Sequence, residues 1–591
     1  MHAARGWAVI AAALALASCA ALRPSPPEAE LEGLVEAYFD EWLALNPTTA
    51  TEIGDHRFDD RLELSPTLAH ETASVALESR YRTAVEAIDP AALDDDARLT
   101  RELFLYGRDM ALERRRHPRR LLPISQFDGG LATDIALYGS GIGAQPFGTI
   151  ADYDHWLARA GRFPRWVDAA IVAMREGMSR GIVHPRAVMA KTVPQLASLA
   201  ATDVETSIFY GPVGLMSKDW PAAERDRLEA AIRTLIEQQL NPSYRRLADF
   251  IRDEYLPACR ETVGWGALPG GADWYASEVR RHTTTALVPA DIHAVGLAEV
   301  GRIRAGMEDV RREVGFEGTL AEFFRYVQEE PAFYFERPAD LLAGYMRLKK
   351  QIDPELPRLF AVVPKADYEV REVEAFRAAS AAGGSYHGAS ADGTRPGIFY
   401  VNTHNLKAQP IFGMETLSLH EAAPGHHFQV SIQQELTGLP RFRRFERNVA
   451  YVEGWALYSE SLGRELGLFT DPMQWYGRLS DEMLRAMRLV VDTGLHAEGW
   501  TRERAIRYMR DNSSLAMTDI EAEVERYIVN PGQALGYKIG DLRIQALRRR
   551  AEETLGAHFD VREFHSAVLT DGALPMEVLE RRIERWIGSL R

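Results

Sequence analysis

One short segment decides how this chain is interpreted: His420-Glu421-Ala422-Ala423-Pro424-Gly425-His426-His427. Two histidines at helical positions i and i+4, with a glutamate after the first, form a zinc-binding motif in which the glutamate is the general base. Here Pro424 occupies position i+4, cannot donate a hydrogen bond to the carbonyl of His420, and is followed by the flexible Gly425. We therefore expect a distorted helix with metal ligands. The simpler alternative is a helix end with surface histidines.

The second histidine ligand is a choice between two neighbours. In a regular helix His426 would lie about 9 Å along the axis from His420 and on a different face. A Pro-Gly bulge can absorb the two extra residues and return His426 to the face of His420. His427 keeps the correct face of an unbroken helix but lies about 10.5 Å along it. Two nitrogens about 2.0–2.1 Å from one zinc ion converge more easily after a bulge, so we favour His426 and keep His427 as the alternative.

A catalytic zinc site also needs a third protein ligand and an open position for water. Glu453 is the best candidate, because it belongs to a predicted helix that is apolar at Val449 and Val452, where an unpaired carboxylate is costly. Glu460 lies seven residues later on the same face and could orient a ligand without touching the metal. A solvated helix face is the alternative for both glutamates.

Composition and periodicity indicate a large, mostly helical globular protein. The chain has 591 residues, of which 46% are apolar and 26% are charged. Its formal net charge of −16 leaves no surplus of Lys and Arg for nucleic acid, so we expect no such partner. Helical patterns dominate, for example over residues 222–239 and 244–255, and one strand is predicted over Gly397–Asn402.

The N-terminus has the features of an export signal. After Arg5, an apolar run of about ten residues is too short to span a bilayer, so residues 1–18 are interpreted as a signal peptide. Leu16-Ala17-Ser18-Cys19 is similar to a bacterial lipobox, which implies cleavage before Cys19 and acylation of its thiol. Because Ala20 is not the Asp of inner-membrane retention, we expect a lipoprotein on the periplasmic side of the outer membrane. A plain secretory signal is the alternative.

Several separated segments carry a family resemblance. They are Leu268–Gly271 with Tyr275, Arg395–Gly397 with Tyr400–Asn402, His420–His427, Val452–Tyr458, Arg488–His496, Pro531–Gly540 and Gly572–Pro575. With them the chain resembles the bacterial proteins grouped as domain of unknown function 885, which look like distant zincins of the glutamate-ligand (gluzincin) type. The resemblance runs from about Leu34 to Ile587. It implies a mostly α-helical zincin-like body with a small β-sheet next to the active-site helix.

The resemblance also implies a function, that of a zinc-dependent metallopeptidase. Zn²⁺ would be held by His420, His426 and Glu453, with Glu421 as general base for hydrolysis of a peptide bond. Manganese or cobalt would suit the same donors. The strand that ends at Asn402 then looks like the zincin edge strand, which pairs with an extended peptide substrate, so that Tyr400 and Asn402 are candidate substrate-binding residues.

Further residues are candidates for contacts with the substrate. Tyr537 and His496 would stabilise the oxyanion, because related zincins use a Tyr or a His there. The alternatives are a packing tyrosine and a structural histidine paired with Asp492. Arg488 and Lys538 could bind a substrate carboxylate, or could be held in salt bridges.

We expect residues 19–30 to be a lipid-anchored tether, residues 31–263 a helical N-terminal region and residues 264–591 the catalytic region, with the two regions joined in one globular unit. Two rival functions share these features: a metal-dependent hydrolase of non-peptide amides such as cell-wall fragments, and a catalytically silent binding protein on the membrane surface. A Ser-His-Asp hydrolase has little support, because no Gly-x-Ser-x-Gly elbow occurs.

Overall fold

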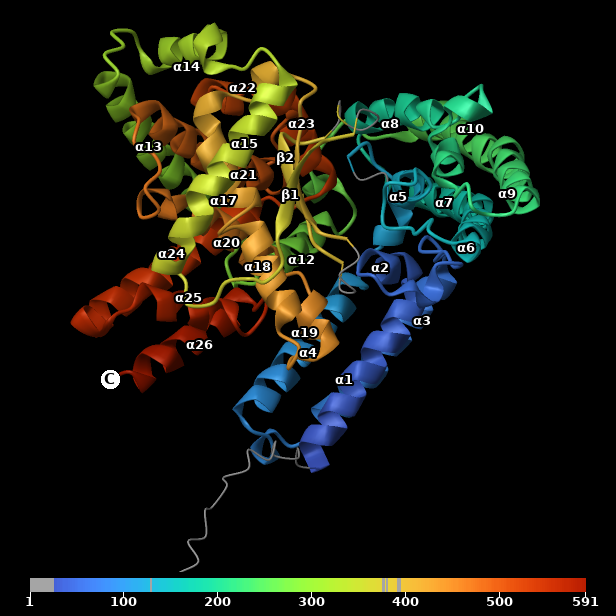
Figure 1. Ribbon diagram of the computed structural model, residues 1–591, viewed down its shortest axis with the longest axis horizontal. Coiled ribbons are helices and arrows are strands. Elements are labelled where there is room, and N and C mark those ends of the chain that lie inside the picture. Colours follow the sequence, from blue (N-terminus) through green and yellow to red (C-terminus); the bar gives the residue numbers. More distant parts are fainter. Residues whose placement is uncertain (1–25, 128–129, 375–377, 379–380, 391–394) are drawn as a thin grey trace, which may run out of the picture.

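Helices make up most of the chain, as predicted, and a single three-stranded sheet lies beside them in the described residues (Figure 1). The computed structural model describes residues 26–591 except 128–129, 375–377, 379–380 and 391–394. The predicted signal segment and Cys19 lie outside the described residues. None of the helices that are described has both the length and the apolar character needed to cross a membrane.

The N-terminal helices form two groups. The first consists of α1 (Pro26–Leu45), α2 (Pro47–Glu52), α3 (Leu68–Glu86) and α4 (Asp95–Arg114). The second, drawn at the right of Figure 1, consists of α5 (Leu131–Tyr138), α6 (Ile150–Ala160), α7 (Phe163–Ser179), α8 (Arg186–Ser198), α9 (Ala222–Leu235), α10 (Asn241–Phe250) and α11 (Leu256–Ala258).

Prolines account for two differences from the predicted boundaries. Helix α1 begins at Pro26, inside the segment expected to be a tether, because a proline in the first turn loses no helical hydrogen bond. The predicted break between residues 239 and 244 is absent. A π-helical turn over Ile236–Leu240 leads directly into α10, so Pro242 lies inside a continuous helical run. The wider π-helical turn just before it accommodates the proline ring and its missing N–H.

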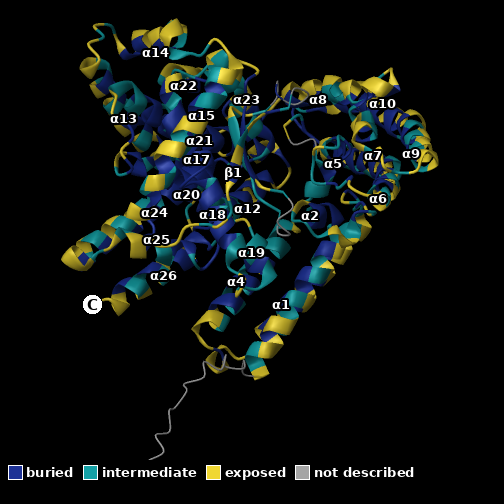
Figure 2. Cartoon of the chain, viewed as in Figure 1, coloured by how far each residue is buried: buried dark blue, intermediate teal, exposed yellow. Residues whose placement is uncertain are grey.

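The rest of the chain forms the body that contains the sheet. Before the sheet come α12 (Gly271–Thr283), α13 (Pro289–Glu313), α14 (Leu320–Glu329) and α15 (Pro338–Ile352). After it come α17 (Met414–Glu421), α18 (His426–Glu435), α19 (Arg441–Phe445), α20 (Val449–Ser461), α21 (Pro472–His496), α22 (Arg502–Asn512), α23 (Met517–Val529), α24 (Leu535–Leu555), α25 (Val561–Leu569) and α26 (Met576–Ser589). Figure 2 shows α17, α20 and α21 at the buried centre of this body.

The sheet has the order β1-β3-β2, with β1 at Tyr368–Glu372, β2 at Gly384–His387 and β3 at Gly397–Val401. Strand β3 is the predicted strand, and it pairs in parallel with β1 and antiparallel with β2. It is therefore the central strand and not the edge strand that the resemblance implied. All five residues of β3 are buried, whereas those of β2 are half-buried. The strand at the sheet edge next to α17 and α18 is β2.

Each of the two large hydrophobic cores contains residues from both predicted regions, before and after residue 264. One joins α5–α10 to α13, α14 and α21–α23, for example through Trp166, Phe323 and Met483. The other joins α1, α3 and α4 to α18, α20 and α24–α26, for example through Phe104 and Trp455. The N-terminal helices are thus packed directly on the body, including the helices that carry the candidate site.

Candidate metal centre

The histidine segment forms a complete break between two helices and not a bulge within one. Helix α17 ends at Glu421 and α18 begins at His426, and the peptide bond between Ala423 and Pro424 is cis. A side chain at Gly425 would overlap the carbonyl oxygen of His420, so the turn needs glycine at that position. The turn places the rings of His420 and His426 with their centres 4.7 Å apart.

Helix α20 brings a carboxylate between the two imidazoles. The Oε2 atom of Glu453 lies 3.3 Å from Nε2 of His426 and 3.8 Å from Nε2 of His420. Glu421 borders the same space, since one ligand atom each from His420, Glu421 and His426 lie within 4.8 Å of one another. Four of the predicted site residues therefore converge, with either glutamate close enough to complete a ligand set.

His427, the alternative ligand, points to the sheet. Its Nδ1 lies 3.1 Å from the hydroxyl of Tyr386 on β2 and 3.3 Å from the hydroxyl of Ser431. Its ring packs on Tyr368 of β1 at 4.7 Å between centres. The two adjacent histidines therefore have different neighbours: His426 lies beside Glu421 and Glu453, and His427 lies against β1 and β2.

Burial and neighbouring charge give Glu421 and Glu453 different pKa values. Burial raises the pKa of Glu421 to about 7. Burial also acts on Glu453, but the adjacent His426 and His420 outweigh it and lower the pKa of Glu453 to about 2. The Glu453 carboxylate is thus kept anionic, yet its buried Oε2 has no hydrogen-bond partner among the described residues. Burial lowers the pKa of His420 well below its usual value, so that ring is neutral and has a nitrogen lone pair to offer.

Glu460 orients His420 from the far side of the ring. Its Oε1 lies 2.8 Å from Nδ1 of His420, which leaves Nε2 facing Glu453. The other oxygen, Oε2, lies 3.4 Å from Arg478, and Arg485 approaches Oε1 at 3.8 Å. Glu460 is thus placed to position the His420 ring without contacting the space between His420, His426 and Glu453.

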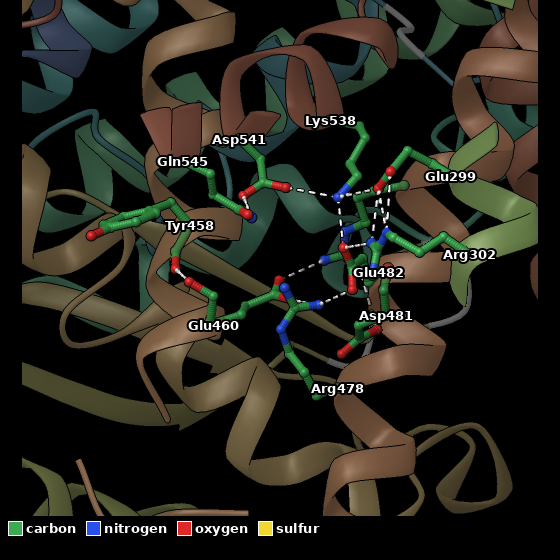
Figure 3. A network of polar contacts seen from close by, with 12 residues as sticks. Glu299, Arg302, Tyr458, Glu460, Arg478, Asp481, Glu482, Lys538, Asp541 and Gln545 are labelled. Carbon is green, nitrogen blue, oxygen red and sulfur yellow. Dashed lines mark hydrogen bonds and ion pairs between the residues drawn. The ribbon is translucent and has the colours of Figure 1, made fainter. Parts of the chain in front are cut away.

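A buried ion network continues from Glu460 into the protein (Figure 3). Arg478 lies 3.4 Å from Glu482, which in turn lies 2.6 Å from Nζ of Lys538. Lys538 also meets Asp541 at 2.8 Å and Glu299 at 3.2 Å, and its side chain has no exposed surface. Lys538 is therefore part of a closed network, and not available to a substrate.

Arg488 and Tyr537 lie together near the metal-site residues. The guanidinium of Arg488 stacks over the Tyr537 ring at 4.3 Å and pairs with Glu523 at 2.9 Å. The Tyr537 oxygen accepts a hydrogen bond of 3.0 Å from Arg526. Positive charge on Arg488 contributes to lowering the pKa of His420, and Arg526 does the same for Glu453, so this group lies within electrostatic range of the site.

Four other predicted residues have structural partners. Both ring nitrogens of His496 are engaged by backbone groups, the N–H of Trp265 at 3.0 Å and the carbonyl of Tyr527 at 2.9 Å, so no ring N–H remains for an oxyanion. Asp492 accepts from the Tyr275 hydroxyl at 2.6 Å and from the N–H of Gly532, and does not pair with His496. The Asn402 side chain donates to the carbonyls of residues 378 and 381, and Tyr400 is buried against His387.

Sequence reasoning missed Tyr386 and Arg485. The backbone N–H of Tyr386 donates to Glu421, and Arg485 is close enough to lower the pKa of the same carboxyl. Arg485 belongs to the helical pattern that precedes Arg488, but nothing in its local sequence distinguishes it from a surface arginine. The strand that contains Tyr386 is four residues long, too short to be recognised by its alternation.

Fold and site together define a mostly helical protein in which two histidines, the buried Glu421 and the partly buried Glu453 meet beside a small sheet. The chain belongs to the bacterial family described as "Bacterial protein of unknown function (DUF885)", whose profile matches residues 47–583. The predicted membership in this family is thereby confirmed.

Two solved structures are similar over almost the whole chain. A candidate lipoprotein from Colwellia psychrerythraea is 29% identical, with a TM-score of 0.89 over 95% of this chain and 99% of its own. A candidate lipoprotein of unknown function from Shewanella oneidensis is 17% identical, with a TM-score of 0.70 over 93% of this chain and 99% of its own, and shows the shared fold. No curated protein matches the chain.

Proposed function

We propose that this protein is a zinc-dependent metallopeptidase whose ligands are His420, His426 and Glu453. The observation that carries the proposal is a convergence of three side chains: the buried Oε2 atom of Glu453, which has no hydrogen-bond partner in the described chain, lies 3.3 Å and 3.8 Å from nitrogens of His426 and His420. A buried carboxylate oxygen without a hydrogen bond is costly, and a divalent cation between these three side chains would offset that cost. Two imidazoles and a carboxylate are a donor set that zinc accepts.

Glu421 is the proposed general base. A zinc ion at the site would act as a Lewis acid and lower the pKa of a water molecule. Glu421 would take a proton from that water as its oxygen adds to the scissile carbonyl carbon, and would deliver the proton to the amide nitrogen as the C–N bond breaks. The hydrogen bond from the backbone of Tyr386 holds the carboxylate for this role.

Tyr537 is the proposed donor to the oxyanion. Its oxygen accepts a hydrogen bond from Arg526, which leaves its own O–H free to donate. Arg488 stacks on the ring and fixes its orientation. His496 is not assigned to this role, because both of its nitrogens have backbone partners.

A peptide is the favoured substrate because an edge strand borders the site. Strand β2 is antiparallel to β3, and Tyr386 links it to Glu421. An extended peptide could add to this edge by main-chain hydrogen bonds and present its scissile amide to the site. The substrate-binding role expected of β3 is thus transferred to β2.

The experiment that tests this function compares the native protein with Glu421→Gln. Both are loaded with zinc, and both are incubated with a peptide library whose cleavage is followed by mass spectrometry. We expect about one zinc per chain in both proteins, and a loss of at least about 100-fold in cleavage rate in Glu421→Gln. Undiminished cleavage by the variant would exclude Glu421 as the base. Cleavage of non-peptide amides alone would favour the rival hydrolase.

We further propose that Cys19 carries lipid and anchors the protein on the periplasmic side of the outer membrane. The lipobox-like segment before Cys19 and the similarity to a candidate lipoprotein support this. Expression of the full chain with Cys19→Ala should move the protein from the membrane fraction to the soluble fraction. An unchanged distribution would contradict a lipid anchor.

A further inference from the structure

A cavity of about 850 Å³ lies between the N-terminal helices and the sheet edge. One wall is formed by α1, α4 and α5, and the other by β2, the end of α18, and α19. Its volume is within the range of ligand pockets, about 300–1,000 Å³. Two lining residues connect it to the metal centre, because Tyr386 binds Glu421 through its backbone and Val452 precedes Glu453.

The lining is rich in positive charge, although the chain as a whole has a net charge of −16. Seven arginines line the cavity against four glutamates. The ion pair of Glu78 with Arg108 at 2.5 Å cancels one charge of each sign, and Arg371 pairs with Glu369. Five arginines therefore remain in the lining against three glutamates. The local excess of arginine therefore favours an anionic ligand.

Four of these arginines, Arg108, Arg114, Arg115 and Arg447, are called here the arginine wall. Within the described residues, Arg114, Arg115 and Arg447 have no carboxylate within the 4.0 Å of an ion pair. Arg108 is buried, and its Nη1 atom has no hydrogen-bond partner in the described chain, although its guanidinium is held over the Tyr38 ring at 3.9 Å. The arginine wall therefore offers a buried donor at Arg108 Nη1 and three guanidinium groups without a carboxylate partner in the described chain.

Arg447 connects the arginine wall to the metal centre. It directly precedes Asn448, which caps the N-terminus of α20. Arg447 is exposed, and its charge acts on His426. A substrate whose scissile bond lies at His426 would therefore have this guanidinium beside its flanking residues.

We propose that the cavity is the substrate-recognition site of this protein and that its arginine wall binds a carboxylate group of the substrate close to the scissile bond. The proposal rests on the metallopeptidase function proposed above. The carboxylate would be either an Asp or Glu side chain or the free C-terminus of a peptide. Arg447 contacts it nearest the metal centre, and Arg108 provides a donor deeper in the cavity.

The test measures binding separately from cleavage. Zinc-loaded Glu421→Gln is titrated with short fluorescein-labelled peptides, and binding is followed by fluorescence anisotropy. Matched pairs differ in one group only: Glu against Gln in one pair, and a free C-terminus against an amidated one in the other. We expect the carboxylate member of at least one pair to bind about tenfold more tightly, and the pair that responds identifies the source. Higher salt should weaken that preference.

Variants made in the same Glu421→Gln background locate the binding group. Arg447→Gln should remove most of the tenfold preference, whereas Arg447→Lys should keep much of it. Arg337→Gln is the matched control, because Arg337 is exposed and its partner is Asp340, outside the cavity. Equal binding of both members of each pair, or a preference that survives Arg447→Gln, Arg115→Gln and Arg108→Gln alike, would overturn the proposal.

Failure of this proposal can be distinguished from failure of the proposed function. Native protein that cleaves peptides without regard to carboxylates would retain the peptidase function and contradict the arginine wall as a recognition site. Protein that binds the carboxylate peptides selectively but cleaves none would support the recognition site and contradict the peptidase.

Discussion

The indole N–H of Trp455 donates a hydrogen bond of 2.8 Å to the carbonyl oxygen of Pro424. The hydroxyl of Ser459 donates to the same oxygen at 3.2 Å. Both donors belong to α20, the helix that also carries Glu453, whereas Pro424 belongs to the turn between α17 and α18. The turn that brings the two histidines together is thus fastened directly to the helix that supplies the proposed third ligand.

Replacing Trp455 with Phe tests that connection. The variant keeps an aromatic ring in the core but removes the N–H donor, so the turn is held by Ser459 alone. We expect the free energy of unfolding to fall by about 1–3 kcal/mol in urea titrations and zinc affinity to fall about tenfold in chelator competition. Trp586→Phe, on the distant α26, is the control and should leave zinc affinity unchanged. Unaltered zinc affinity in Trp455→Phe would show that this bond does not shape the site.

Glu460→Gln tests the orientation of His420. The amide retains the shape of the side chain but accepts a weaker hydrogen bond from the ring. We expect zinc affinity to fall about 10–100-fold, measured by chelator competition. Glu465→Gln serves as the control, because Glu465 lies close to Glu460 in the sequence but pairs with Arg548 at 2.9 Å. If both variants bind zinc as the native protein does, Glu460 has no positioning role.

Gly454→Ala tests the close approach of α20 to α24. A Cβ atom at Gly454 would lie 2.5 Å from the Cα atom of Gly540, so the two helix backbones would have to separate. We expect a loss of about 1–3 kcal/mol in the free energy of unfolding. Gly301→Ala, on an exposed face of α13 with nothing near the added Cβ, should instead stabilise by about 0.5–1 kcal/mol. Equal effects of the two variants would contradict the role of the crossing.

Glu482→Gln tests the ion network of Figure 3 through its pH dependence. Burial would raise the pKa of Glu482, but Arg478 and Lys538 outweigh it and lower the pKa from 4.5 to about 2. A lowered folded-state pKa stabilises the protein above the unfolded value, and this stability is lost as pH falls through the folded value. We expect the variant to be about 3–5 kcal/mol less stable at pH 7, and the difference to shrink below about pH 4.5. A difference that is constant from pH 7 to pH 4 would contradict a charged Glu482.

The positions of Glu453 and Glu460 could be predicted from the sequence, because helical spacing determines which residues share a face. Glu453 and Glu460 share one face of α20, and each lies close to His420, as their seven-residue spacing indicated. The choice of His426 over His427 followed from the Pro-Gly pair, which permits a change of direction. The same pair accounts for the end of α17, because Pro424 disfavours helical backbone at Ala423 and cannot donate a hydrogen bond to the helix. Our expectation of a bulge underestimated this local effect.

The remaining differences concern β3, His496 and Lys538. The edge position of β3 was implied by the family resemblance, whereas its continuous apolar run is typical of a strand buried on both faces, as the order β1-β3-β2 shows. Histidine is a common catalytic residue type, so His496 was a reasonable candidate. Its hydrogen-bond partners, Trp265 and Tyr527, lie 231 and 31 residues away in the sequence, so its structural role was not visible locally. Lys538 is enclosed by Glu299, Glu482 and Asp541, which only the packing of α13, α21 and α24 brings together.

The most direct test of the metal centre is the zinc content of His426→Ala beside that of His427→Ala, measured by mass spectrometry of the metal after zinc loading and dialysis. We expect about one zinc per chain in native protein and in His427→Ala, and almost none in His426→Ala. Zinc retained in His426→Ala but lost from His427→Ala, or absent from the native protein, would contradict this expectation.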